Sequence, residues 1–129
     1  MSIVGHGIDL VSVSRIGSMI DRHGAHFLGR VYTLAEQSYC ERSPKRRLEH
    51  YAARFAAKEA VLKAIGTGWR DGIAWTDVEV VLEPSGKPTI ALSGKASSIA
   101  IIEGISHFHI SLSHTGDFAM ASAIAERRG

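Results

Sequence analysis

The alternation of apolar and polar residues predicts that the chain begins with a strand followed by a helix. Residues 3–11 form an apolar run, which is typical of a strand. Ser14 is a suitable N-cap, and the helix that it would begin extends to about His23, where Gly24 ends it. The first unit is therefore one strand and one helix.

Two further helices are predicted in the middle of the chain. Thr33 and Glu36 have the spacing of a capping box and predict a short helix that ends near Arg42. The Ser-Pro pair that follows predicts the start of a long helix, because proline at the first helical position loses no hydrogen bond. That helix carries the sequence HYAARFAAKEAVLKAI and ends at Gly66.

The second half of the chain has the pattern of two strand pairs with a helix between them. Pro-Ser-Gly-Lys and Thr-Gly supply the turns within the pairs, and Ser93 is the predicted helix cap. The predicted elements are the strands 77–84 and 88–92, the helix 94–103, and the strands 107–114 and 117–125. The sequence therefore predicts an α+β fold in which a mostly antiparallel sheet packs against a long helix and shorter helices.

Composition is that of one globular domain over residues 1–129. The chain is 45% hydrophobic and 22% charged, which is ordinary for such a domain. Its start lacks the pattern of a signal peptide, and no stretch is long and apolar enough to span a bilayer. Cys40 is the only cysteine, so an intrachain disulfide is impossible. We therefore expect a cytoplasmic protein that does not act in a membrane.

The net charge of +2 is small, but the basic residues are clustered. Residues 42–54 carry five basic side chains against one acidic side chain, and residues 15–30 carry three against one. Such clusters suit phosphate groups or an acidic partner protein. The alternative, that they are only solvated helix faces, stays open at this point.

Glu59 and Lys63 lie four residues apart on the long helix, on the side that also carries Phe55. At this spacing a glutamate and a lysine form a surface ion pair worth about 0.2–0.5 kcal/mol. We expect these two residues to lie along the apolar stripe of the helix, where purely surface pairs are uncommon. A catalytic role and a structural ion pair are therefore both considered.

Asp9 interrupts the apolar first strand, where aspartate is disfavoured. A buried carboxylate needs a partner, which can be an arginine, backbone amides or a metal ion. Two carboxylates with phosphate oxygens and waters are typical of a magnesium site on a phosphate-containing substrate. Asp9 and Glu59 are thus candidate ligands, but the sequence does not establish that they meet.

Two features of the last strand pair are also ambiguous. His114 ends the apolar row of Phe108, Ile110 and Leu112, and a histidine there can be structural or can bind a ligand. Alanine occupies the four alternate positions from 119 to 125, and this smooth face suits either the protein's own helix or another subunit. The sequence contains no phosphate-binding loop, dinucleotide fingerprint or nucleophile elbow.

Several segments together resemble one family. They are residues 7–15 (GIDLVSVSR), 55–68 (FAAKEAVLKAIGTG), 75–94 and 111–115 (SLSHT). The segments occur in the family's order, cover nearly the whole chain, and include one highly specific motif at 55–68. The chain is similar to the holo-acyl-carrier-protein synthases, the small phosphopantetheinyl transferases.

The resemblance implies an enzyme that transfers 4'-phosphopantetheine from coenzyme A to a serine of apo acyl carrier protein. The reaction would release 3',5'-adenosine bisphosphate, require Mg²⁺ and support fatty acid biosynthesis. The resemblance implies that Asp9 and Glu59 bind Mg²⁺, that Glu59 and Lys63 are catalytic, and that Glu59 or a metal-bound water accepts the proton. By the same resemblance, the residues that bind coenzyme A are Arg54, Lys63, Gly66, Pro88 and His114, and those that bind the carrier protein are Arg15, Met19 and Arg22.

The family resemblance also implies a homotrimer whose sites lie at subunit interfaces. We expect the first helix of one subunit to serve the metal site of its neighbour. One alternative is a non-catalytic basic module that binds nucleic acid or an acidic protein, but it leaves Asp9 and Glu59 unexplained, and carboxylates would repel nucleic acid. Another is a different magnesium-dependent enzyme that acts on a nucleotide diphosphate.

Overall fold

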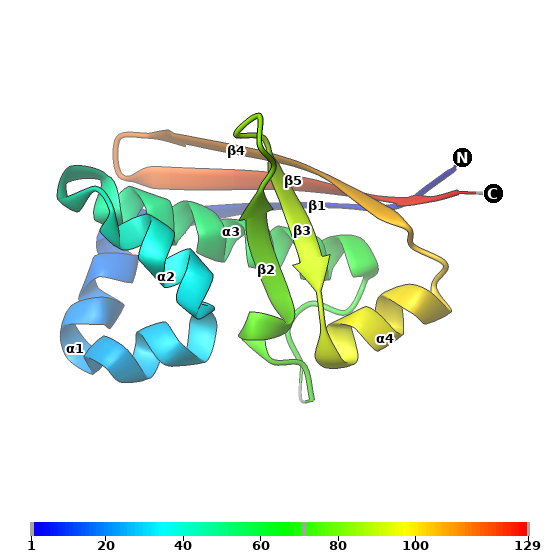
Figure 1. The fold of residues 1–129 in the computed structure, drawn as a ribbon, viewed down its shortest axis with the longest axis horizontal. Coiled ribbons are helices and arrows are strands. Elements are labelled where there is room, and N and C mark those ends of the chain that lie inside the picture. The colour runs from blue at the N-terminus through cyan, green and yellow to red at the C-terminus, as the bar shows by residue number, and fades with distance from the viewer. Residues whose placement is uncertain (1, 71, 129) are drawn as a thin grey trace.

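The structure is a computed structural model that describes residues 2–70 and 72–128. Figure 1 shows the elements in their order along the chain, with 3₁₀ turns at Pro44–Arg46 and Trp75–Asp77. The strands are β1 (Ser2–Ser12), β2 (Val78–Leu82), β3 (Pro88–Leu92), β4 (His107–Thr115) and β5 (Phe118–Arg127). The helices are α1 (Val13–Val31), α2 (Leu34–Glu41), α3 (Arg47–Ile65) and α4 (Gly94–Ile102).

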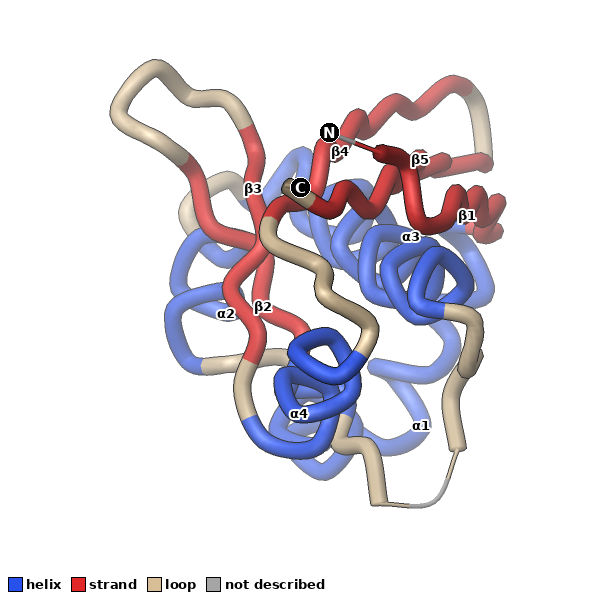
Figure 2. The backbone as a smooth tube through the Cα atoms, turned by 90° about the vertical axis from the view of Figure 1, so that its right-hand side faces the viewer, coloured by secondary structure: helices blue, strands red, loops and turns tan. Residues whose placement is uncertain are grey.

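All strand pairs are antiparallel, and they form two sheets. The larger sheet has the strand order β1-β5-β4, and the smaller sheet is the β2-β3 hairpin. Figure 2 shows α3 lying along one face of the larger sheet, with α1 and α4 beyond it. The predicted α+β fold, an antiparallel sheet packed against a long helix, is confirmed.

Strand β1 contacts α3 with its backbone. A Cβ atom added at Gly5 would lie 1.9 Å from the carbonyl oxygen of Ala64, and one added at Gly7 would lie 1.9 Å from that of Ala60. The four alternate alanines of β5 are at most 1% exposed and face the same helix. Of the two alternatives for this alanine face, packing against the protein's own helix is therefore correct.

A buried ion pair connects α2, α3 and β2. Lys58 is completely buried and donates hydrogen bonds to Glu36 Oε1 at 2.7 Å and to the carbonyl oxygens of Trp75 and Val78. The other oxygen of Glu36 accepts the backbone N–H of Val80 at 2.8 Å. Burial lowers the pKa of Lys58, and the Glu36 carboxylate opposes that shift. The pair thus holds the hairpin against the helices.

Glu36 also completes the capping box predicted at the start of α2. It accepts the N–H of Thr33 at 2.9 Å, and the Thr33 hydroxyl accepts the N–H of Glu36 at 3.2 Å. The predicted end of α3 at Gly66 is confirmed by the left-handed conformation of that residue, with φ of 93°.

Other predicted boundaries are wrong. Helix α1 begins after Ser12 rather than Ser14. Gly24 interrupts the helix as predicted, with φ of 51° and ψ of −130°, but a second helical segment then extends to Val31. The second half forms because Phe27 and Val31 are buried in the core, which outweighs the weak local signal. Pro44 begins a 3₁₀ turn before α3, and neither Ser43 nor Ser93 makes a side-chain cap.

We expect Gly7→Ala to destabilise the fold by at least about 3 kcal/mol, because the new Cβ would overlap the backbone of α3. Gly29→Ala is the matched control, since nothing lies within 4 Å of its Cβ position on α1. Gly29→Ala should increase the free energy of unfolding by about 1 kcal/mol or less. Urea unfolding followed by circular dichroism measures both, and equal stabilities would contradict direct contact of β1 with α3.

Candidate active site

Asp9 reaches α3 because it lies on the same face of β1 as the two glycines that contact the helix. Its side chain is 18% exposed, and Asp9 Oδ1 lies 3.1 Å from Lys63 Nζ. The same ammonium donates to the carbonyl oxygen of Ile8, also at 3.1 Å. The sequence had suggested a structural ion pair between Lys63 and Glu59. Within the described residues, the carboxylate that pairs with Lys63 is instead that of Asp9.

The Asp9 and Glu59 carboxylates lie close enough to influence one another. Burial raises the pKa of Glu59, the neighbouring Asp9 carboxylate raises it further, and Lys63 lowers it. The shift therefore comes first from burial and then from repulsion between the two carboxylates, which Lys63 opposes. The structure therefore brings together two predicted ligands that lie 50 residues apart in sequence.

These carboxylates line a cavity of about 550 Å³, here called the carboxylate cavity. Its wall also contains the predicted carrier-protein residues Arg15 and Met19 from α1. The rest of the wall is largely apolar and consists of Leu10, Val11, Ser12, Ile16, Phe27, Phe55 and Phe118. One subunit thus places the candidate metal ligands and two of the candidate docking residues at one cavity.

The prediction that Glu59 and Lys63 lie along the apolar stripe of α3 is wrong. Helix α3 is buried on most of its surface, and Phe55, Glu59 and Lys63 form its least buried row. The reason is that the larger sheet, α1, α2 and the hairpin cover the other sides of the helix. The row is therefore the side of α3 that remains accessible to a ligand.

A second cavity, of about 330 Å³ and here called the cationic cavity, contains another group of the predicted residues. Arg54, Pro88 and His114 line it, together with Tyr39 and His50. Arg54 is only 4% exposed, its guanidinium lies 4.0 Å from the centre of the Tyr39 ring, and its Nε atom has no hydrogen-bond partner among the described residues. A buried cation without a paired carboxylate is typical of an anion site.

Two histidines share the cationic cavity with Arg54. His114 Nδ1 lies 2.6 Å from Glu49 Oε2, which fixes the orientation of the imidazole ring. The pKa of His50 is lowered by burial and then by the positive charges of Arg54 and Arg46. The cavity thus combines a positive potential with aromatic and proline surfaces.

Helix α3 separates the two cavities, which share no lining residue. Arg54 and Glu59 are five residues apart and therefore point about 140° apart around the helix. Asp9 lies on edge strand β1, whereas His114 lies on the opposite edge strand, β4. Gly66 and Arg22 line neither cavity, and Gly66 instead ends α3.

Several cavity residues were not candidates in the sequence. Phe27 belongs to the unpredicted half of α1, and Tyr39 lies on α2, so no local motif marked either. Phe118 could have been identified from the sequence, because it alternates with the alanines of β5 and therefore lies on the opposite face of the strand. In the structure its side chain is 50% exposed. Glu49 was noted only as a charge, because its contact with His114 joins α3 to β4 across 65 residues of sequence.

Comparisons with known proteins identify the family. A family model described as the 4'-phosphopantetheinyl transferase superfamily matches residues 5–123. A holo-[acyl-carrier-protein] synthase from Koribacter versatilis is 52% identical over 124 residues, which cover 96% of this chain and 98% of that protein.

Solved structures show the same likeness. The holo-[acyl-carrier-protein] synthase of Neisseria meningitidis has a TM-score of 0.87 and 35% identity, covering 98% of this chain and 100% of that one. The Helicobacter pylori enzyme in complex with coenzyme A has a TM-score of 0.83 and 29% identity, covering 94% and 99%. By fold and sequence, this chain belongs to the 4'-phosphopantetheinyl transferase superfamily.

Proposed function

We propose that the chain is a holo-[acyl-carrier-protein] synthase. It transfers the 4'-phosphopantetheine group of coenzyme A to a serine of apo acyl carrier protein. The matching transferase family model, the relatives named holo-[acyl-carrier-protein] synthase and the complex of one of them with coenzyme A support this activity. The observation that carries this proposal is the meeting of Asp9 and Glu59 at one cavity, with Lys63 Nζ 3.1 Å from Asp9 Oδ1, in a chain of this family. The step serves fatty acid biosynthesis.

The carboxylate cavity suits a divalent cation. Two carboxylates, Asp9 and Glu59, line this cavity, and one ammonium, that of Lys63, lies 3.1 Å from Asp9 Oδ1. Mg²⁺ is commonly held by one or two carboxylates and completes its coordination with substrate phosphates and waters. When bound, Mg²⁺ would supply charge stabilisation for the diphosphate.

The chain needs no nucleophile of its own, because the carrier serine attacks the β-phosphorus of coenzyme A. A new serine–phosphorus bond forms, the bond to 3',5'-adenosine bisphosphate breaks, and the serine proton is released. Glu59, which lines the carboxylate cavity, is the proposed acceptor for that proton, directly or through a water. Lys63 would stabilise negative charge on the transferred phosphoryl group.

The cationic cavity is the proposed site for the adenosine bisphosphate part of coenzyme A. Arg54 and His114 would bind phosphate, and Pro88 and Tyr39 would supply apolar contacts. The unpartnered guanidinium of Arg54 supports this assignment. Gly66 lies within one turn of Lys63 at the end of α3. We therefore propose that Gly66 contacts the part of coenzyme A that lies near Lys63, and not the adenosine bisphosphate part.

We further propose a homotrimer in which the carboxylate cavity of one subunit joins the cationic cavity of its neighbour. The division of the site by α3 supports this arrangement, because coenzyme A must reach both groups of residues. The larger sheet offers a surface for assembly, since the face away from α3 exposes a large apolar patch. That patch consists of Ile8, Leu10, Phe118 and Met120, which are 38–62% exposed.

We place the enzyme in the cytoplasm and treat residues 1–129 as one transferase domain. The buried, unpaired thiol of Cys40 supports a reducing compartment. One connected cluster of buried residues, spread over all the long elements, supports a single domain. Within the described residues, no helix is both long enough and apolar enough to cross a membrane.

The direct test of function is to incubate the protein with coenzyme A, Mg²⁺ and apo acyl carrier protein and to weigh the carrier. A mass gain of one phosphopantetheine group is expected. An unchanged carrier mass in the presence of folded protein would refute the proposed activity.

We expect Asp9→Asn and Glu59→Gln each to reduce transfer at least about 100-fold, because removal of an electrostatic partner of the transition state has effects of this size. Glu103→Gln is the control and should retain normal activity. It alters an exposed carboxylate at the end of α4 that lines neither cavity. Wild-type activity in Glu59→Gln would remove that residue from the mechanism.

The raised pKa of Glu59 also predicts a pH-dependent effect on stability. Ionised Glu59 destabilises the folded state at neutral pH, whereas below its ordinary pKa of 4.5 the group is protonated in both folded and unfolded protein. Glu59→Gln should therefore raise the Tm measured without Mg²⁺ at pH 7.5 and leave it unchanged at pH 4. A lower Tm at pH 7.5 would instead indicate a structural ion pair.

Arg15 and Arg22 lie seven residues apart on α1, with Met19 between them, and are proposed to attract the acidic carrier protein. Arg15→Glu/Arg22→Glu should raise the carrier KM about tenfold and flatten its dependence on salt, since such charges act mainly on encounter. Arg30→Glu, which reverses one charge on the same helix beyond Gly24, is the control. An equal rise in the coenzyme A KM would argue against a docking role.

The shared site predicts that two inactive chains restore each other. Glu59→Gln mixed with Arg54→Met/His114→Ala should recover activity, since about a quarter of the sites in a randomly mixed trimer would have both halves intact. Glu59→Gln mixed with Arg15→Glu/Arg22→Glu should not recover, because Arg15 and Glu59 line the same cavity. Light scattering must show a trimer, and a mixed trimer without recovery would place the whole site on one subunit.

A further inference from the structure

The start of α1 is held by a residue from the opposite end of the chain. A helix leaves its first backbone N–H groups without partners inside the helix. Here the N–H of Val13 donates to the backbone oxygen of Asp117 at 2.7 Å, and the N–H of Ser14 donates to Asp117 Oδ1 at 2.8 Å. The N–H of Arg15 donates to Ser12 Oγ at 3.2 Å. Asp117 thus satisfies two of the first three amides.

The second carboxylate oxygen of Asp117 completes the connection. Asp117 Oδ2 accepts hydrogen bonds from Ser12 Oγ and Ser14 Oγ, both at 2.8 Å. The hydrogen bonds from these two hydroxyl groups lower the pKa of the Asp117 carboxyl, and the hydrogen bond from the backbone N–H of Ser14 lowers it to a smaller extent. Helix α1 has no acidic residue in its own first turn. Asp117 therefore provides the negative charge that a helix N-terminus favours, from 103 residues away in sequence.

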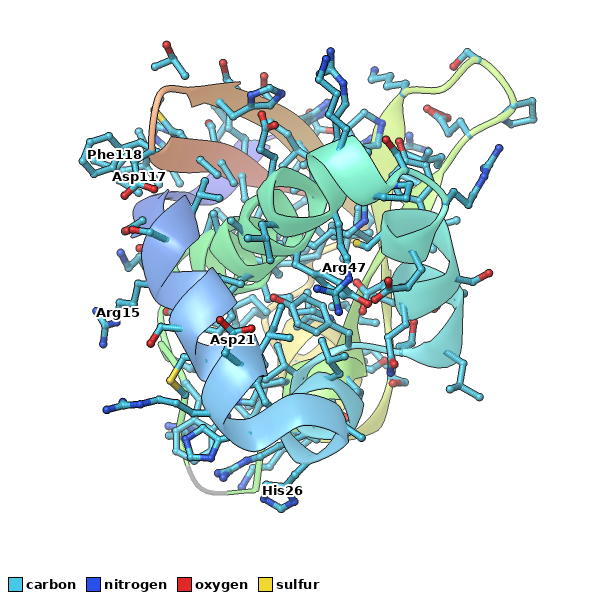
Figure 3. All side chains as sticks on the ribbon, turned by 90° about the vertical axis from the view of Figure 1, so that its left-hand side faces the viewer. Arg15, Asp21, His26, Arg47, Asp117 and Phe118 are labelled. Carbon is cyan, nitrogen blue, oxygen red and sulfur yellow. The ribbon has the colours of Figure 1, made fainter. Side chains whose placement is uncertain are left out.

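This connection lies at the edge of the carboxylate cavity. Phe118, the next residue after Asp117, lines that cavity together with Arg15 and Met19. Figure 3 shows Asp117 and Phe118 at the N-terminal end of α1, with Arg15 projecting outward further along the same helix. Strand β1, which carries Asp9, runs into α1 through Ser12. The position of the first turn of α1 thus sets the position of Arg15 relative to Asp9.

We propose that Asp117 is a positioning residue for the carrier protein: it fixes the first turn of α1 so that a docked carrier presents its serine to Asp9 and Glu59. The inference rests on the proposed function. Asp117 contacts no reacting atom, and it acts through Ser12 and Ser14. A shift of the first turn of α1 would move Arg15 and Met19, the proposed docking residues, relative to Asp9 and Glu59, so the carrier would dock productively only at higher concentration.

Steady-state kinetics of the full-length protein with apo carrier and coenzyme A test the proposal. Asp117→Ala should raise the carrier KM about tenfold and leave the coenzyme A KM within twofold of wild type. Asp117→Asn, which keeps an acceptor for the Ser14 amide, should give an intermediate carrier KM. Asp21→Ala removes an exposed acid from the same helix and should not raise the carrier KM. Ser14→Ala combined with Asp117→Ala should add little to Asp117→Ala alone, since both disrupt one connection.

The outcomes separate the inference from the function. A wild-type protein that transfers no phosphopantetheine refutes the proposed function and the positioning role with it. An active wild type with an unchanged carrier KM in Asp117→Ala refutes only the positioning role. A proportional rise in both KM values, or full additivity with Ser14→Ala, also overturns it, because the residue would then act on general stability. Circular dichroism of each variant confirms that the comparison is made between folded proteins.

Discussion

The backbone contact between β1 and α3 is the constraint on which the rest of the molecule depends. Gly7 has no side chain, so the strand lies directly against the carbonyl of Ala60, and the alanines of β5 extend this close packing across the sheet. Because side chains alternate along a strand, the next residue on the face of the two glycines is Asp9. The same contact that joins sheet and helix therefore delivers Asp9 to Glu59. A larger side chain on that face would shift the candidate metal ligands along with the strand.

Such close packing buries α3 almost completely. Its two buried basic residues differ in whether they have hydrogen-bond partners inside the protein. Lys58 is satisfied inside the protein by Glu36 and two backbone carbonyls. Arg54, one turn earlier, is nearly as buried but has only the face of Tyr39 against its guanidinium. A buried cation costs folding free energy unless an anion compensates it. The contrast on one helix is between a cation paired inside the protein and one whose Nε atom has no hydrogen-bond partner among the described residues.

The sequence predicts what depends on neighbouring residues and misses what depends on distant ones. The capping box of Thr33 and Glu36 was predictable, as were most strands, because each arises from a short pattern. The second half of α1 was not, since Phe27 gains its burial only from the assembled core. Asp9 stood out as a polar residue in an apolar strand, whereas Asp117 lies in an ordinary turn and acts on α1 across the whole fold. The division of the candidate site between two cavities was equally hidden, because it requires knowing which sheet edges flank α3.

That division has an electrostatic consequence within each subunit. If Arg54 lay beside Asp9 and Glu59, the three groups would form an internal ion cluster, and neither a cation nor a phosphate would gain much by binding. Helix α3 prevents this by holding acids and guanidinium on opposite sides, with its backbone and packed side chains between them. Each side therefore retains an uncompensated charge, negative beside β1 and positive beside β4. A ligand with a diphosphate and a bound cation complements both, and a neighbouring subunit that brings the two sides together would create a site that the isolated chain keeps apart.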